Sequence, residues 1–349
     1  PLERHFSRTQ TMRVFIAGST GVLGKRLVEE FVKRSHDVVG LTRDDRGDKI
    51  VEERGGEPRR GDILDKESLI DAIDGNVDVV IHAATAIPTK MKPSNEDWKM
   101  NDRVRREGTE NLVEAAGEAD ADTYLQQSIT WVAKQPDGSK FDESSDVNPD
   151  RVTRSAVDAE RIAKKGGEEH GFDVGVIRCG WFYSHDSAHT RMMAENLLKG
   201  RLPIIGGGIL GRRDAKMSFS HVDDAARAFV TVAESGIPNG DNSSSQESNL
   251  WHVVDDRPVT YADFISELAD RLDASSPRRI PAWLARFFVG SYNADFFTSP
   301  IPTTNEKFRR DFDWEPEYPT YKEGLQKLVN EWESEGTIVE TQNGYRWNA

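Results

Sequence analysis

The sequence predicts an α/β protein, with a doubly wound parallel sheet followed by a smaller C-terminal α/β lobe. Short apolar runs typical of buried strands alternate with helix-periodic segments through the first half of the chain. Three glycines spaced three apart stand where the first strand would turn into the first helix. We therefore expect a disordered extension over 1–11, a sheet domain over 12–183 to which some later segments return, a second lobe over 184–335 and a tail over 336–349.

The glycines Gly18, Gly21 and Gly24 follow the apolar run 14–17 and open a helix-periodic segment. At such a turn the first N–H groups of the helix and its positive dipole end favour an anion, usually a pyrophosphate. Gly18 would allow the turn, Gly21 the approach of the phosphates, and Gly24 close packing of helix on strand. A tight turn without a ligand is the alternative. The expected cofactor-binding residues here are Gly18, Ser19, Thr20, Gly21, Val22, Leu23 and Gly24.

The second strand is expected over 36–41, and its end distinguishes the two nicotinamide dinucleotides. An acidic residue there bonds the ribose 2′-hydroxyl of NAD, whereas an arginine accepts the 2′-phosphate of NADP. Thr42 stands where the acid is expected, and Arg43 follows it. The pattern favours NADP over NAD, although Asp44 and Asp45 leave contact with a ribose hydroxyl open. A solvated loop charge is the alternative for Arg43.

Three further strands of the sheet are expected over 58–62, 78–82 and 123–128. The carboxyl ends of parallel strands meet at one edge of a doubly wound sheet, and ligands bind there. The last of these strands ends in Ser128, which places a hydroxyl at that edge. The other expected cofactor-binding residues, from the first two strand ends and from a long helix over 95–116, are Asp62, Ile63, His82, Ala83, Ala84, Thr85 and Asn101.

The remaining segments complete the sheet domain and form the second lobe. Residues 281–297 are unusually aromatic, so they form the core of that lobe, a lid over an apolar substrate, or a subunit contact. The tail shows no obvious pattern. Further helices are expected over 65–73, 150–170, 190–198, 222–233, 260–272, 305–312 and 321–333, and further strands over 173–178, 202–205 and 251–254.

Composition narrows the class of protein. The net charge of −14 argues against non-specific binding to nucleic acid or to an anionic membrane. No apolar stretch is long enough to span a bilayer, so we expect a cytoplasmic protein. Acidic residues spread along the chain suggest a halophilic protein, with an ordinary acidic cytosolic protein as the alternative. The single cysteine, Cys179, excludes an intrachain disulfide.

Several motifs, taken in order, resemble the extended short-chain dehydrogenase/reductase family. They are Gly18/Gly21/Gly24, Asp62-Ile63, His82-Ala83-Ala84-Thr85, Asn101 with Gly108-Thr109 and Asn111, Ser128, Arg178 to Tyr183, Phe219 to Asp224, and Trp314 to Leu325. The resemblance is to an atypical member of the NAD-dependent epimerase/dehydratase branch and covers about residues 12–330. It implies a Rossmann-type sheet, a bound NAD or NADP, and a substrate-binding second lobe. It also implies a homodimer built on helices 95–116 and 150–170.

The chain departs from this family at its usual proton donor. There, a tyrosine and a lysine four residues later act beside the serine: the phenol exchanges a proton with the substrate oxygen, and the lysine lowers the phenol pKa. In register, Val152 and Ala156 occupy those two positions, and neither can move a proton. Tyr183 and His185 are the substitutes that the sequence offers beside Ser128, each with a structural role as its alternative.

Two functions follow. The first is an NAD(P)-dependent oxidoreductase, epimerase or dehydratase that acts on a small carbonyl or hydroxyl compound, or on a sugar-type substrate, with Ser128, Tyr183 and His185 as catalytic residues. The alternative is a catalytically silent NADP-binding sensor or scaffold. No metal site is predicted, because His185 and His189 lack a third ligand by motif.

Overall fold

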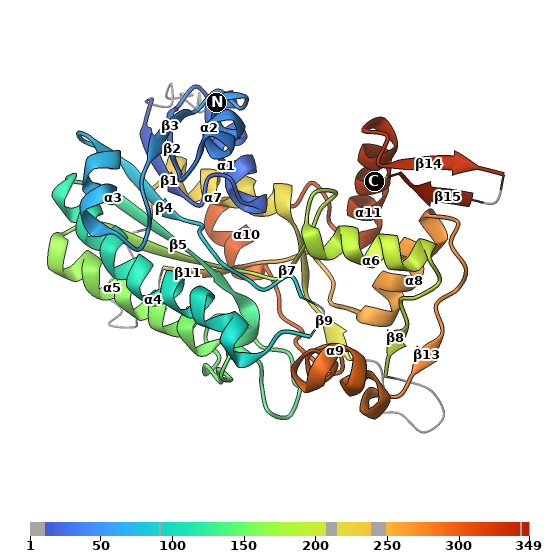
Figure 1. Cartoon of the computed structure of the whole chain (residues 1–349). Helices are drawn as coiled ribbons and strands as arrows, with labels where there is room; N and C mark the ends of the chain where they lie inside the picture. Colours follow the sequence, from blue (N-terminus) through green and yellow to red (C-terminus); the bar gives the residue numbers. More distant parts are fainter. Residues whose placement is uncertain (1–10, 91, 207–214, 239–248, 343, 349) are drawn as a thin grey trace, which may run out of the picture.

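The computed structural model describes residues 11–90, 92–206, 215–238, 249–342 and 344–348. Within these residues, seven parallel strands form one central sheet (Figure 1). In spatial order they are β11 (Leu250–Val253), β6 (Asp173–Cys179), β5 (Thr123–Ile129), β4 (Val79–His82), β1 (Arg13–Ala17), β2 (Asp37–Thr42) and β3 (Glu57–Arg60). The Rossmann-type, doubly wound α/β fold that the sequence predicts is therefore confirmed.

The strand order reverses between β1 and β4, which are neighbours in the sheet although β2 and β3 separate them in the chain. Ala17 is aligned with His82 in this pair, and the Ala83 N–H donates a hydrogen bond to the Ala17 carbonyl. The segments that follow both strands thus leave the sheet at the same edge. Ligands of doubly wound sheets bind at this position.

Helices cover both faces of the sheet and bury its apolar strands. Val14, Phe15 and Ile16 of β1 are fully buried between the two helical layers. Helices α1 and α7 pack together on one face, and α4 and α5 pack together on the other (Figure 1). The helices are α1 (Val22–Lys33), α2 (Asp45–Glu52), α3 (Lys66–Ile73), α4 (Asn95–Glu118), α5 (Arg154–His170), α7 (Val222–Ser235) and α10 (Glu306–Phe312).

The second lobe lies beyond the carboxyl edge of the sheet (Figure 1). Its core includes Phe219 and Phe264, whose rings stack with centroids 4.3 Å apart. Its helices are α6 (Ala188–Leu198), α8 (Tyr261–Arg271), α9 (Ala282–Phe296) and α11 (Tyr321–Ser334). Its short strand pairs are β7 (Trp181–Tyr183) with β10 (Phe219–His221), β8 (Ile204–Ile205) with β13 (Arg279–Ile280), and β9 (Lys216–Met217) with β12 (Val259–Thr260).

The aromatic segment of this lobe forms α9, which is kinked at Gly290, where φ is 80°. Before the kink, Trp283, Phe287 and Phe288 are exposed. After the kink, Phe296 is buried. Core packing therefore accounts for the second half of the segment and not for the first.

Three helices differ from the sequence prediction, and one of them is α9, which the sequence analysis treats only as an aromatic segment. The patterns do not predict α2, because its sequence is polar and leaves few apolar residues to show a helical period. Helix α5 begins at Arg154 rather than at 150, because the Asp150 carboxylate accepts hydrogen bonds from the N–H groups of Val152 and Thr153 and holds them in a turn.

Regular structure extends into the tail, where the sequence shows no obvious pattern. Residues of the tail form the hairpin of β14 (Ile338–Thr341) and β15 (Gly344–Trp347), and Trp347 packs edge-on against Trp332 of α11, with centroids 5.2 Å apart. Short, mostly polar strands carry too weak an alternation to be recognised in sequence. Most of the predicted N-terminal extension, residues 1–10, lies outside the described residues.

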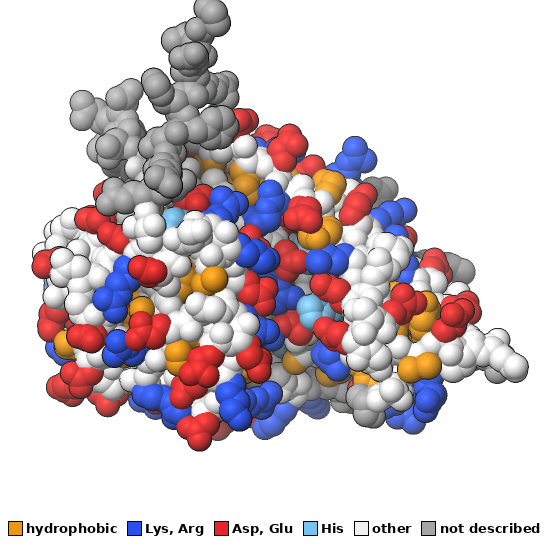
Figure 2. All heavy atoms as spheres, turned by 90° about the horizontal axis from the view of Figure 1, so that it is seen from above, with side chains coloured by type: hydrophobic (Ala, Val, Ile, Leu, Met, Phe, Trp, Pro, Cys, Tyr) orange, Lys and Arg blue, Asp and Glu red, His pale blue; other side chains and the backbone are white. Residues whose placement is uncertain are grey.

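Acidic and basic side chains are mixed over the face seen from above (Figure 2). The halophilic character suggested by the net charge of −14 stays a prediction. None of the described helices is long and apolar enough to cross a membrane.

Candidate active site

The turn after β1 is shaped by glycine. Gly18 has φ of +91°, and a Cβ there would lie 2.5 Å from the backbone nitrogen of Ala84. A Cβ on Gly24 would lie 2.0 Å from the Gly18 carbonyl oxygen. Helix α1 starts directly after Gly21, and no side chain caps its first N–H groups. The turn therefore packs tightly on the loop after β4 and leaves a helix N-terminus available to an anion.

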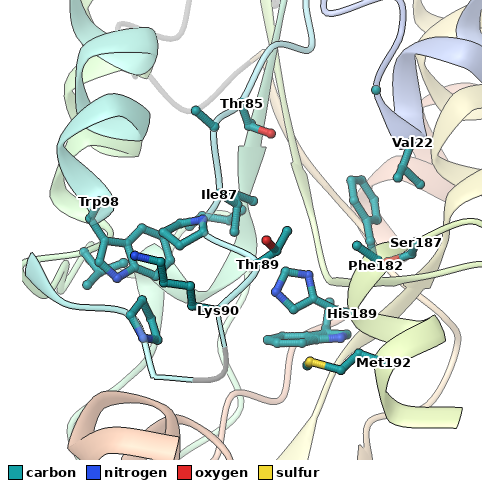
Figure 3. Close-up of a pocket in the computed structure, with 18 of the residues that line it drawn as sticks. Val22, Thr85, Ile87, Thr89, Lys90, Trp98, Phe182, Ser187, His189 and Met192 are labelled. Carbon is teal, nitrogen blue, oxygen red and sulfur yellow. The ribbon is translucent and has the colours of Figure 1, made fainter. Parts of the chain in front are cut away.

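A cavity of about 910 Å³ opens at this edge, between the sheet and the second lobe (Figure 3). This volume lies at the upper end of the range for ligand sites, so it has room for a dinucleotide and a small substrate. One end of the cavity is the glycine turn. The predicted cofactor-binding residues that line it are Gly18, Thr20, Gly21, Val22, Leu23, Thr42, Arg43, Asp62, Ile63, Ala83, Ala84 and Thr85.

Four predicted cofactor residues lie behind the cavity wall. Ser19 donates a hydrogen bond to the Leu41 carbonyl at 2.8 Å, and the Asn101 side-chain oxygen accepts one from the Ala86 N–H at 3.0 Å. Gly24 packs on the turn, and the His82 side chain is buried under the strand ends. These residues support the shape of the site, because none of the four lines the cavity.

The acidic residues at the end of β2 are engaged with their own surroundings. Asp44 caps α2 by accepting a hydrogen bond from the Gly47 N–H at 2.7 Å, and Asp45 and Asp48 pair with Arg60. Arg43 is exposed and lines the cavity. Within the described part of the chain, its guanidinium makes no hydrogen bond or ion pair.

The other end of the cavity is walled mainly by aromatic and apolar side chains. In Figure 3, Trp98 of α4 stands on one side and Phe182 on the other, with Ile87, Thr89 and His189 between them. Burial lowers the pKa of His189, although a hydrogen bond to the Pro88 carbonyl raises it. Further aromatic residues of this end are Trp131, Trp181, Tyr261, Phe288, Tyr292, Phe296 and Phe297.

The predicted catalytic hydroxyl does not reach this cavity. Ser128 is buried on the opposite side of β5, where it donates a hydrogen bond to Glu160 at 2.5 Å. Glu160 also accepts two hydrogen bonds from Arg178, at 2.8 and 2.7 Å. The strand neighbours Gln127 and Ile129 line the cavity instead. Ser128 therefore belongs to a buried ionic cluster with Glu160 and Arg178.

Tyr183, the first predicted substitute, also lies away from the cavity. Its side chain is fully buried in the second lobe, and its hydroxyl donates a hydrogen bond to Asp255 at 3.0 Å. A Cβ on Gly324 of α11 would lie 2.3 Å from this hydroxyl, so glycine is required for the close packing. Burial raises the pKa of Tyr183 well above its usual value.

The protonation of Asp255 makes the stability of the folded protein depend on pH. Burial raises its pKa to about 8, while the hydrogen bonds from Tyr183 and from the His221 N–H act to lower it. The folded protein therefore keeps this proton to about pH 8, whereas the unfolded chain releases it at about pH 4. The stability supplied by the neutral carboxyl is complete below about pH 4 and is lost as the pH rises towards 8.

We expect Asp255→Asn, which mimics the neutral acid, to remove this loss. Between pH 5 and pH 7, the free energy of unfolding of the wild type should fall relative to the variant by about 2–3 kcal/mol. Urea denaturation of both proteins across this interval measures the difference. Asp256→Asn, at the neighbouring position, is the control. Its free energy of unfolding should fall between pH 5 and pH 7 by most of the amount seen for the wild type. If the difference in free energy of unfolding between the wild type and Asp255→Asn were the same at pH 5 and pH 7, the expectation would be contradicted.

His185, the second predicted substitute, is held on the outer side of α11. Its two ring nitrogens lie 2.7 Å from Glu331 and 3.2 Å from Glu335. Burial lowers the pKa of His185, but the hydrogen bond to Glu331 and the neighbouring carboxylates raise it overall. His185 does not line the cavity, so the structure does not bring the three predicted catalytic residues together. The described residues include no group of three side chains placed to hold a metal ion.

Apolar residues occupy the two positions at which the family's tyrosine and lysine are expected. Val152 lines the cavity, and Ala156 is buried against Ile129. A charged residue that the sequence patterns did not single out, Arg105 of α4, also lines the cavity. Its spacing of four from both Asn101 and Thr109 places it on the buried face of the helix, and this signal was available in the sequence.

Comparison with known proteins assigns the family. Residues 14–242 match the model of the NAD dependent epimerase/dehydratase family. The chain belongs to this family. A 3-diazoavenalumate denitrifying reductase from Streptomyces sp is 30% identical over 330 residues, which cover 90% of this chain and 99% of that protein. The predicted class, an NAD(P)-dependent oxidoreductase enzyme of the epimerase/dehydratase family, is thereby confirmed.

Solved structures of epimerase/dehydratase proteins share the fold. A double mutant of DesIV, a dTDP-glucose 4,6-dehydratase from Streptomyces venezuelae with NAD bound, superposes with a TM-score of 0.73 at 19% identity and covers 92% of this chain and 97% of its own. The human epimerase family protein SDR39U1 with NADPH has a TM-score of 0.72 at 16% identity, with 91% and 99% covered. Members of this fold therefore bind NAD or NADPH.

Proposed function

We propose that this protein is an NADPH-dependent reductase that replaces the diazo group of an aromatic compound by hydrogen and releases dinitrogen. The observation that carries the proposal is a continuous cavity that runs from the glycine turn to an aromatic wall and is lined by the apolar side chain of Val152. The size of the cavity and its aromatic lining suit a dinucleotide with a flat, unsaturated substrate beside it.

The residues present fit a bound dinucleotide. Gly18, Gly21 and the uncapped N-terminus of α1 would hold its pyrophosphate, and Asp62 and Ile63 would flank its adenine. Arg43 supports NADP over NAD, because its guanidinium is exposed at the cavity and the acidic residues around it are engaged elsewhere.

We take Val152 and Ala156 to stand in the register of the family's tyrosine and lysine, and this assignment supports a reduction that needs no proton donor. When an alcohol forms from a carbonyl, an acid must supply a proton to the oxygen. When a reduced nicotinamide supplies hydride to an aromatic diazonium carbon, the C–N bond breaks with both electrons on nitrogen, a C–H bond forms, and neutral dinitrogen leaves. The relative aligned over nearly its whole length is named as a denitrifying reductase of a diazo compound.

The test is a reduction assay with two aromatic probes, 3-diazo-4-hydroxybenzoate and 4-hydroxybenzaldehyde. We expect NADPH to be consumed with the diazo compound, with one dinitrogen released for each NADPH oxidised. With NADPH deuterated at C4 of the nicotinamide, the label should appear at C3 of 4-hydroxybenzoate. A reaction without protein corrects for direct reduction, because diazo compounds react readily with hydride donors.

His189 provides a second arm of this test. It is an ionisable residue of the aromatic end, and a carbonyl reduction without tyrosine would depend on such a group. We expect His189→Ala to retain diazo reduction. If the aldehyde were reduced faster than the diazo compound, and His189→Ala abolished this reaction, the protein would be a carbonyl reductase and the proposal would be rejected. NADPH binding without turnover of either probe would instead favour the silent sensor or scaffold.

A further inference from the structure

Arg105 is a buried charge that faces the cavity. It lies on α4, its side chain lines the cavity, and only 6% of the residue is exposed. Burial lowers the pKa of Arg105 to about 10, while Asp102 and Tyr292 act to raise it. The guanidinium therefore remains charged at neutral pH.

Within the described residues, this guanidinium makes no hydrogen bond and no ion pair. Glu160 raises its pKa through charge alone, and the carboxylate of Glu160 is already bonded to Arg178 and Ser128. Asp102 also acts only through charge. Buried arginines are normally paired, because an uncompensated charge in a protein interior is costly. The free protein thus holds a guanidinium ready to pair with an anion that enters the cavity.

The surroundings of Arg105 distinguish it from the phosphate-binding end of the site. Its charge acts on Tyr292 of α9, whose ring packs edge-on against Trp98 with centroids 6.0 Å apart. Both aromatic rings line the cavity. At the cofactor end, the helix N-terminus after Gly21 and the exposed Arg43 are available to phosphates. An anion at Arg105 would therefore be flanked by aromatic rings.

We propose that Arg105 binds the carboxylate of the substrate, so that the substrate class is an aromatic or unsaturated carboxylic acid. The inference rests on the proposed function for the identity of the site as a substrate site, but it concerns binding rather than the reaction. A guanidinium presents two parallel N–H donors that match a carboxylate, and such charge-assisted pairs are strong where water is excluded. Arg105 is thus a specificity residue of the aromatic end.

The experiment measures binding of 4-hydroxycinnamate and of its neutral amide, 4-hydroxycinnamamide, by calorimetry in the presence of NADP. The wild type should bind the acid at least about tenfold more tightly than the amide. Arg105→Gln should lose this preference by weakening the acid while changing the affinity of the amide less than about threefold. Arg105→Lys keeps the charge but not the two parallel donors, so its preference for the acid over the amide should lie between those of the wild type and Arg105→Gln.

Arg103→Gln is the matched control, because Arg103 lies on the same helix but is exposed and paired with Glu107. It should keep the preference for the acid. Thermal unfolding checks the fold of each variant, and Arg105→Gln should be at least as stable as the wild type, because it removes a buried charge that makes no hydrogen bond or ion pair within the described residues.

Two results would overturn the inference. One is an unchanged ratio of acid to amide affinity in Arg105→Gln. The other is a loss of NADP affinity in Arg105→Gln with the acid preference intact, which would assign the guanidinium to the cofactor. A lost acid preference in a protein that does not reduce 3-diazo-4-hydroxybenzoate would reject the proposed reaction and leave the carboxylate site standing.

Discussion

Replacing Glu160 by glutamine is expected to lower the free energy of unfolding by about 3–5 kcal/mol. Glu160 and Arg178 are almost fully buried, with side-chain exposures of 7% and 4%, and their charges neutralise one another at 2.7 Å. The variant leaves the Arg178 charge buried without a counter-ion, and this loss is much larger than that of a hydrogen bond alone. Urea denaturation at pH 7, followed by circular dichroism, measures the change.

Glu107→Gln is the control for this prediction, because it removes the carboxylate of an exposed pair with Arg103 on α4. It should cost about 1 kcal/mol or less, as exposed ion pairs contribute little. Equal free energies of unfolding of Glu160→Gln and Glu107→Gln would contradict the structural role of the buried cluster.

Ser128→Ala should leave reductase activity unchanged per folded molecule, because the Ser128 hydroxyl faces Glu160 and not the cavity.

The fate of Ser128 illustrates what the sequence can and cannot predict. The run 123–128 correctly indicates a strand that ends at the carboxyl edge of the parallel sheet. Successive side chains of a strand point to opposite faces. Gln126, Gln127 and Ser128 are three polar residues in succession, so the sequence does not reveal that Gln127 and Ile129, rather than Ser128, face the cavity.

Tyr183 and His185 fail for a different reason. The partners that hold them come from distant parts of the chain, Asp255 for Tyr183 and Glu331 for His185. No local period or motif encodes such pairings. The placement of the glycine turn could be predicted because the backbone requirement at Gly18 is local, with a positive φ and close contact to a neighbouring strand end.

Arg43→Ala is expected to reduce the affinity for NADPH by about 100-fold, or about 2.7 kcal/mol. Within the described residues, the guanidinium of Arg43 makes no ion pair, and its side chain lines the cavity beside Thr42, at the end of β2. In doubly wound sheets that bind dinucleotides, the adenosine ribose commonly lies at the end of this strand. Loss of a charge-assisted contact to the 2′-phosphate removes binding that NADH cannot have. Fluorescence titration of the protein with each reduced dinucleotide measures the two affinities separately.

Affinity for NADH should change less than about threefold in Arg43→Ala, because the glycine turn and the residues proposed to flank the adenine remain. Arg46→Ala is the matched control: Arg46 is exposed on α2 and does not line the cavity, so both affinities should stay at their wild-type values. The difference in NADPH affinity between the wild type and Arg43→Ala should be largest at low ionic strength, because salt screens the attraction between an exposed guanidinium and a phosphate. Equal losses of affinity for NADPH and NADH in Arg43→Ala would show that Arg43 shapes the site without contacting the 2′-phosphate. The glycine turn would then bind NAD as well as NADP.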